Sequence, residues 1–163
     1  MIEQAPALII IIPLLAALLL IPATPLGPRF AYGLLVTALA AALAAALATL
    51  NLVMAGNQAV HYRLGDWLPP HGIELVIDHL SGVVLVLVSG CALLTAIYSL
   101  RTAKEDNPDR LNQYYALFAL LVTGLLGMTA TGDVFNLYVL LEISALSSYG
   151  LLARGRGPAY YAT

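Results

Sequence analysis

The chain has 163 residues, of which 61% are hydrophobic and 10% are charged, whereas about a quarter of the residues in an average soluble protein are charged. This composition excludes an ordinary soluble domain and predicts an integral membrane protein in contact with the lipid bilayer. The net charge of -2 leaves no basic surface for a phosphate backbone, so nucleic-acid binding is not expected. The single cysteine, Cys91, excludes an internal disulfide and a multi-cysteine metal site.

Charged residues are spaced so widely that five membrane-spanning helices are predicted. About 20 apolar residues in a helix cross the hydrocarbon core of a bilayer, which is about 30 Å thick. Four long stretches contain no Asp, Glu, Lys or Arg, and a fifth is interrupted by Glu142 alone. We therefore expect an all-α, polytopic fold that forms one transmembrane domain over residues 1–163, with helices at about 5–22, 30–55, 79–100, 111–130 and 134–153.

The longest polar connection, residues 56–77, separates the second predicted helix from the third. Residues 61–64 and 73–77 have the composition of short strands, and the turn-forming residues Gly65-Asp66 and 69–72 lie between them. The pattern favours a small hairpin-like loop, with an irregular cap as the alternative. Nothing in this loop has the pattern of a catalytic site.

Small residues recur at intervals of four along one face of the fourth predicted helix. They are Ala119, Thr123, Gly127 and Thr131. A stripe of this kind lets a neighbouring backbone approach closely. We interpret it as a packing surface without a direct chemical role.

The charges in the connections predict the orientation of the helices. If five helices alternate in direction, six of the seven Lys and Arg residues fall on one side of the membrane and Arg63 falls on the other. Basic residues favour the cytoplasmic side. We therefore expect the N-terminus and loop 56–77 outside, and the C-terminus and loop 101–110 in the cytoplasm, in the inner (plasma) membrane. The six residues on the cytoplasmic side would be Arg29, Arg101, Lys104, Arg110, Arg154 and Arg156.

Glu142, in the fifth predicted helix, is the residue that most needs an explanation. It lies nine positions after Asp133 and twelve before Arg154. At about 1.5 Å per residue, these separations are roughly 13 Å and 18 Å, which is near the membrane midplane. A carboxylate there should face protein or water and be neutralised by a cationic partner or a proton. It is either a proton-handling group or a structural tie between two helices.

Other polar residues could take part in proton transfer. Tyr138 and Tyr149 share the helical face of Glu142, so their hydroxyls could relay a proton. Asp133 is a second proton-transfer candidate, although capping of the fifth helix is the favoured interpretation. Asp78 and His79, at the start of the third helix, are candidates for proton entry, although capping also explains Asp78.

The sequence offers Glu142 no basic partner within the predicted helices. Its only lysine, Lys104, lies in the predicted cytoplasmic loop, so we expect the counter-ion to come from elsewhere. The three histidines lack the spacing of a metal site, and no Gly-rich phosphate loop is present. We therefore expect neither a metal nor a cofactor.

The sequence from Thr131 to Tyr149 resembles the fifth-helix signature of the antiporter-like membrane subunits. This family is shared by Mrp-type Na+/H+ antiporters, respiratory complex I and membrane-bound hydrogenases. Residues 62–67 and 75–81 resemble its outer loop and third-helix entry. The sequence Asp-Val-Phe-Asn-Leu-Tyr from Asp133, with the closing residues 154–163, looks most like the D-type subunit of the Mrp antiporters.

The resemblance implies a role for Glu142 in proton transfer. In the family, the corresponding glutamate pairs with a lysine on a broken helix further along the chain, within inverted repeats. This sequence ends before such a helix. We expect either a partial chain, corresponding to the N-terminal portion of a family member, or one half of a split subunit. Another membrane subunit would then supply the lysine-bearing helix.

Three functions are compatible with these features. The leading hypothesis is a subunit of a monovalent cation/proton antiporter of the Mrp type, with no covalent chemistry of its own. The alternative is a proton-pumping membrane subunit of an NADH:quinone oxidoreductase or a membrane-bound hydrogenase, in which other chains carry out the electron chemistry. The third is a structural membrane subunit with no proton role.

Overall fold

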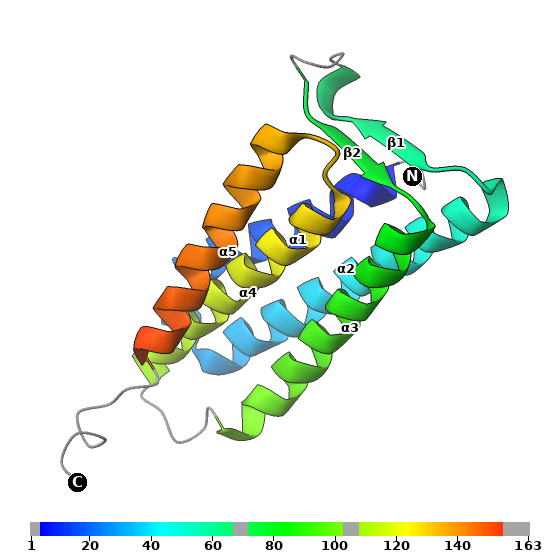
Figure 1. The fold of residues 1–163 in the computed structure, drawn as a ribbon. Helices are drawn as coiled ribbons and strands as arrows, with labels where there is room; N and C mark the ends of the chain where they lie inside the picture. Colours follow the sequence, from blue (N-terminus) through cyan, green and yellow to red (C-terminus); the bar gives the residue numbers. More distant parts are fainter. Residues whose placement is uncertain (1–3, 67–71, 103–107, 155–163) are drawn as a thin grey trace, which may run out of the picture.

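The computed structural model describes residues 4–66, 72–102 and 108–154, which form a bundle of helices with a small hairpin at one end (Figure 1). We call this end the hairpin end, and the opposite end, where α3 finishes and α4 begins, the loop end. The helices in the described residues begin and end within three residues of the predicted ranges. They are α1 (Ala5–Leu20), α2 (Pro28–Gly56), α3 (His79–Thr102), α4 (Pro108–Ala130) and α5 (Val134–Arg154).

Four of these helices, α2 to α5, are long and apolar enough to cross a membrane. The first helix, α1, is apolar but has 16 residues, so it is about 24 Å long and shorter than the hydrocarbon core of a bilayer. Pro22 accounts for this difference from the expected range, because it follows Ile21, the C-cap residue of α1, whereas Pro13 lies inside the continuous helix. The structure therefore contains four candidate spans and one shorter apolar helix among the described residues.

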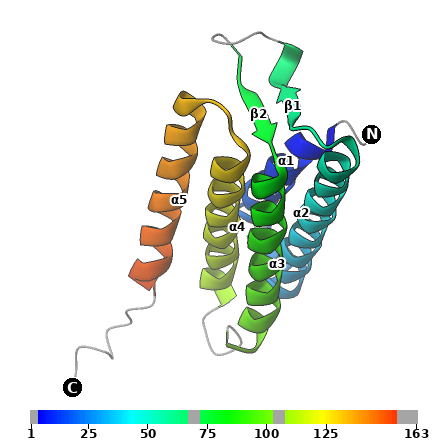
Figure 2. The ribbon, with the colours of Figure 1, turned by 45° about the vertical axis from the view of Figure 1, so that its right-hand side comes forward.

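Helix α4 lies at the centre of the bundle and packs against α1, α2, α3 and α5. The remaining close helix pairs are α1 with α2 and α2 with α3. Figure 2 shows α5 standing at one side of the bundle, next to α4. Most of α5 is therefore uncovered by the described part of the chain.

Small residues allow the helices to approach closely. In α2, Ala38, Ala42 and Ala46 are buried one turn apart. In α4, Ala119 and Thr123 of the predicted stripe are buried, and Leu140 of α5 packs over Gly127. The stripe is therefore a packing surface, in agreement with its interpretation from the sequence.

The polar connection between α2 and α3 forms a hairpin. Strands β1 (Val60–Arg63) and β2 (Glu74–Ile77) are antiparallel, with Val60 opposite Ile77 and Arg63 opposite Glu74. The side chains of Leu75 and Ile77 are buried beneath it, as expected when alternate residues of a strand face the core. The hairpin, and not the irregular cap, is the form that the loop takes. Part of the predicted turn, residues 67–71, lies outside the described residues.

Candidate functional site: the carboxylate of Glu142

Glu142 lies on the face of α5 that points away from α4. Residues of the opposite face, Leu140, Ser144 and Ser147, are buried, whereas Tyr138 and Tyr149, on the Glu142 face, are 62% and 66% exposed. Glu142 itself is partly exposed. Successive helical residues turn by about 100°, so these exposures separate a face packed against α4 from a face that the described chain leaves open.

Neither tyrosine is hydrogen-bonded to Glu142. Among the described residues, the carboxylate of Glu142 has no hydrogen bond or ion pair. The three side chains share one face of the helix, as the helical projection predicted, but they do not form a direct network. Any relay between them would require water or groups from outside the described chain.

Asp133 caps the start of α5. Its Oδ1 accepts a hydrogen bond from the backbone N–H of Phe135, and its Oδ2 accepts one from that of Asn136, both at 3.2 Å. Both bonds satisfy N–H groups that have no partner within the helix. Of the two interpretations of Asp133, the structure contains the cap. A role of its carboxylate in proton transfer stays a prediction.

Asp78 caps the start of α3 through Ser81. Its Oδ1 accepts hydrogen bonds from the Ser81 hydroxyl at 2.6 Å and from the Ser81 backbone N–H at 2.7 Å. The Ser81 hydroxyl oxygen accepts in turn from the backbone N–H of Asp78 at 2.8 Å. The bond from the hydroxyl, and then the bond from the backbone, lower the pKa of Asp78 below its usual value. The neighbouring His79 is exposed, and proton entry through this pair stays a prediction.

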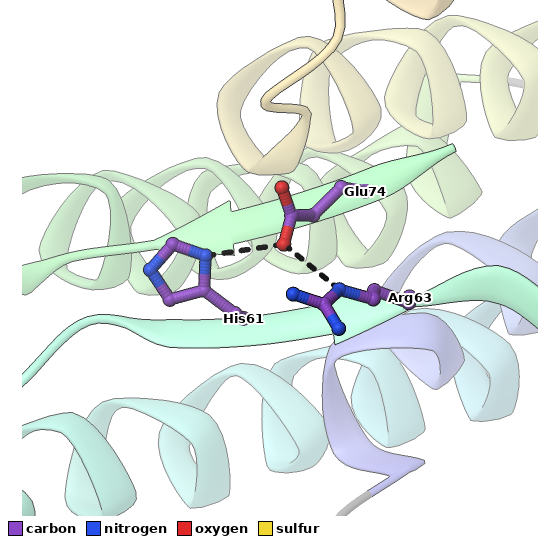
Figure 3. A network of polar contacts seen from close by, with 3 residues as sticks. All are labelled: His61, Arg63 and Glu74. Atoms are coloured by element: carbon purple, nitrogen blue, oxygen red, sulfur yellow. Dashed lines mark hydrogen bonds and ion pairs between the residues drawn. The ribbon is translucent and has the colours of Figure 1, made fainter. Parts of the chain in front are cut away.

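A charged cluster on the outer surface of the hairpin was not anticipated from the sequence. Oε1 of Glu74 lies 3.3 Å from Nδ1 of His61 and 3.5 Å from Nε of Arg63 (Figure 3). All three side chains come from paired strands, and Arg63 lies directly opposite Glu74 in the register. Alternate side chains of a strand lie on the same face, so the strand register would have been enough to place these three residues together.

Two further features lie away from Glu142. An apolar cavity of about 90 Å³ at the hairpin end lies between α1, the hairpin and the start of α5, with Asn136 as a polar lining residue. Near the loop end, Asn112 of α4 is buried, and its side-chain amide has no hydrogen-bond partner in the described part of the structure. Neither feature includes Glu142, so the candidate site consists of the open face of α5.

Comparison with known proteins identifies sequence relatives that include oxidoreductase subunits and antiporter subunits. Over 155 residues, or 95% of this chain, the sequence is 41% identical to the N-type subunit of the NADH-quinone oxidoreductase of Desulforudis audaxviator (strain MP104C). Over 97 residues, or 60% of this chain, it is 45% identical to the D-type subunit of a probable K+/H+ antiporter of Rhizobium meliloti (strain 1021). The matches cover 31% and 17% of those relatives, so this chain spans less than a third of their length. No protein-family model matches the chain.

Two solved structures contain a similar fold. One is the membrane-bound sulfane sulfur reductase, an archaeal respiratory membrane complex, with a TM-score of 0.83 and 30% sequence identity over 90% of this chain and 30% of that chain. The other is the Mrp complex from Dietzia sp. DQ12-45-1b, with a TM-score of 0.78 and 32% identity over 91% of this chain and 27% of that chain. Sequence and fold thus point to the same group of membrane subunits.

Proposed function

This chain belongs to the antiporter-like membrane subunits, and we propose that it is part of a monovalent cation/proton antiporter of the Mrp type in which Glu142 takes part in proton transfer. The proposal rests on one observation above all. Glu142 is an acidic residue in the middle of an apolar helix, on a face that the described chain leaves open. A carboxylate at that depth is costly unless it has a partner or a proton.

The proposed mechanism uses two states of Glu142. In one state the carboxylate is charged and paired with a cationic side chain, and in the other it is protonated and neutral. Movement of the cationic group away from Glu142 removes its attraction, and the carboxylate then takes up a proton. The hydroxyls of Tyr138 and Tyr149, which share the open face, would pass protons to and from Glu142 through water.

The cationic group is proposed to come from a lysine-bearing helix of another membrane subunit or of a longer form of this chain. Among the described residues, no Lys or Arg lies between Phe30 and Met54 of α2, within residues 79–99 of α3, or within 111–130 of α4. The one lysine of the sequence, Lys104, lies outside the described residues. The two structures with a similar fold are an archaeal respiratory membrane complex and an Mrp complex, which supports assembly of this chain with other membrane subunits.

The chain is a multi-pass protein of the plasma membrane, and we propose that its hairpin end faces outward. The excess of basic residues on the loop-end connections supports this orientation. Asp78 and His79 would then lie at the outer surface, where they would admit protons toward the bundle. The carboxylate of Asp78 is charged at neutral pH, as an ordinary aspartate is, and its capping bonds lower its pKa further.

A second candidate function is proton pumping in a redox-driven complex. It is favoured by the match to the NADH-quinone oxidoreductase relative, which covers 95% of this chain, and by the fold shared with the sulfane sulfur reductase complex. The role of Glu142 would be the same in either complex. Purification of the chain with its native partners distinguishes them, because a redox complex would bring subunits that carry iron–sulfur clusters.

Replacement of Glu142 by Gln tests the proposed proton role. Membrane vesicles from cells that produce the chain with its native partners would be assayed for cation-driven proton movement with a pH-sensitive dye. We expect Glu142→Gln to abolish exchange while the assembled complex stays at normal abundance, because glutamine keeps the size of the side chain but cannot carry its charge. Glu74→Gln, the same change on the hairpin surface, is the matched control and should exchange normally. Normal exchange in Glu142→Gln would refute the proposal.

A further inference from the structure

We propose that the turn between α4 and α5, held against strand β2 of the hairpin, sets the rotation and the height of α5 and so positions Glu142. We call this contact the clamp; it consists of the backbone carbonyl of Glu74, of residues 75 and 76 of β2, and of residues 131–136 of the turn and first helical residues. The inference rests on the proposed function of Glu142. It assigns a positioning role to residues that lie far from that carboxylate.

Backbone contacts join the turn to the free edge of β2. The N–H of Gly132 donates a hydrogen bond to the carbonyl oxygen of Glu74 at 2.9 Å, and Thr131 forms an antiparallel bridge with Leu75. Because β1 pairs with the other edge of β2, the turn acts as a short third strand. Movement of the hairpin is therefore transmitted to the residues that begin α5.

Gly132 allows this contact because it has no side chain. A Cβ atom at this position would lie 2.5 Å from Cγ2 and 3.2 Å from Cβ of Val76, and real side chains do not approach so closely. Valine is branched at Cβ and has few rotamers to which it can move. Any larger residue at position 132 must therefore push the turn away from the hairpin.

Side chains then join the turn to the first residues of α5. The carboxylate of Asp133 caps Phe135 and Asn136. The side-chain Nδ2 of Asn136 donates to Oγ1 of Thr131 at 3.0 Å, which closes a ring across the turn. Strand β2, the turn and the start of α5 therefore form one hydrogen-bonded unit.

A rigid helix carries this anchoring to Glu142. Nine residues separate it from Asp133, which is about 13 Å along the axis, and a slip of one residue in the helix would rotate Glu142 by about 100°. Of the described helices, α4 is the one that packs closely against α5, with Gly124 and Gly127 as notches for Ser144 and Leu140. The clamp is a second anchor, at the start of α5. Together with the contact to α4, it fixes the direction in which the open face of α5, with Glu142, points.

Two pairs of variants test whether the turn positions α5 or whether its residues transfer protons themselves. Asparagine keeps one of the two capping acceptors of Asp133 and alanine keeps neither, so Asp133→Asn should lower the exchange rate and shift its pH profile less than Asp133→Ala does. Gly132→Ala should lower the rate about tenfold, since small misplacements at a reacting group have large effects. Gly90→Ala is its control, because a Cβ at Gly90 meets no atom within 4 Å.

The position of α5 can be measured directly in the same assembled complex. Spin labels at Leu152→Cys of α5 and Leu94→Cys of α3, both on exposed positions, would be introduced together with Cys91→Ser. We expect Gly132→Ala and Asp133→Ala to shift the distance between the labels, Asp133→Asn to shift it less because one capping acceptor stays, and Gly90→Ala to leave it unchanged.

The outcomes distinguish the clamp from the proposed function. An unchanged label distance in both Gly132→Ala and Asp133→Ala would overturn the clamp, whatever Glu142 does. A shifted distance with normal exchange would also overturn it as a positioning device, and loss of exchange in Asp133→Asn with an unchanged distance would assign the carboxylate itself to proton transfer. Normal exchange in Glu142→Gln would instead overturn the proposed function, and the distances would still show whether the clamp holds α5.

Discussion

The acidic residues at the hairpin end have hydrogen-bond or ion-pair partners, whereas the acidic residue in the middle of α5 has none among the described residues. At the hairpin end, Glu74 contacts His61 and Arg63, and both Asp78 and Asp133 cap helices. In the middle of α5, the carboxylate of Glu142 has no partner among the described residues. The chain therefore provides partners for the acidic residues of its hairpin end, whereas the described residues provide none for the carboxylate of Glu142.

The contact between α4 and α5 determines which face of α5 stays open, and its disruption should have the strongest effect on stability. A Cβ at Gly124 would lie 2.7 Å from Cβ of Ser144 and 2.8 Å from the carbonyl oxygen of Leu140. Because backbone atoms cannot move aside easily, Gly124→Ala should lower the free energy of unfolding by about 1–3 kcal/mol. Thermal unfolding of the purified protein in detergent measures this change.

Gly33→Ala of α2 is the control for Gly124→Ala. A Cβ there meets no atom within 4 Å, and alanine favours a helix by about 0.5–1 kcal/mol over glycine, so its stability should be equal or higher. If both variants unfolded at the same temperature as the parent, α5 would not depend on close contact with α4. Packing against α4 would then no longer be evidence that the Glu142 face of α5 is the open one.

A smaller effect should appear at Asp78, where the capping bonds lower the pKa of the carboxyl. The ionised carboxylate therefore stabilises the folded state above the usual aspartate pKa of about 3.9, and this stabilisation is lost as the pH falls through the lowered value. Asp78→Asn keeps a capping side chain but cannot ionise. Its melting temperature should lie below that of the parent near neutral pH and approach it in acid. A difference that stays constant across this pH range would contradict the capping account.

The sequence was sufficient to predict the helices and the hairpin, because both follow from local patterns. Charge-free stretches mark the spans, and turn-forming residues between strand-like segments mark the hairpin. The expected first helix extends past the end of α1 at Leu20, because the apolar stretch continues up to Pro22 and does not itself mark where the helix ends. The clustering of Tyr138 and Tyr149 on the face of Glu142 also followed from helical geometry.

Contacts between segments that are distant in the chain could not be predicted from the sequence. The pairing of Glu74 with Arg63 depends on the strand register, which local composition does not determine. The hydrogen bond from Gly132 to Glu74 joins segments separated by two whole helices, and no local signal indicates it. For Asp133, the sequence allowed two roles. The positions of its carboxylate oxygens relative to the first N–H groups of α5 show the cap, and these positions depend on the conformation of the turn.

Infrared spectroscopy can show directly whether Glu142 changes its protonation state within the membrane. Infrared difference spectra of the assembled complex, recorded between low and high pH, report carboxyl groups that gain or lose a proton. We predict a carboxyl band that is present in the parent and in Glu74→Gln but absent in Glu142→Gln. Identical spectra for the parent and Glu142→Gln would contradict the account.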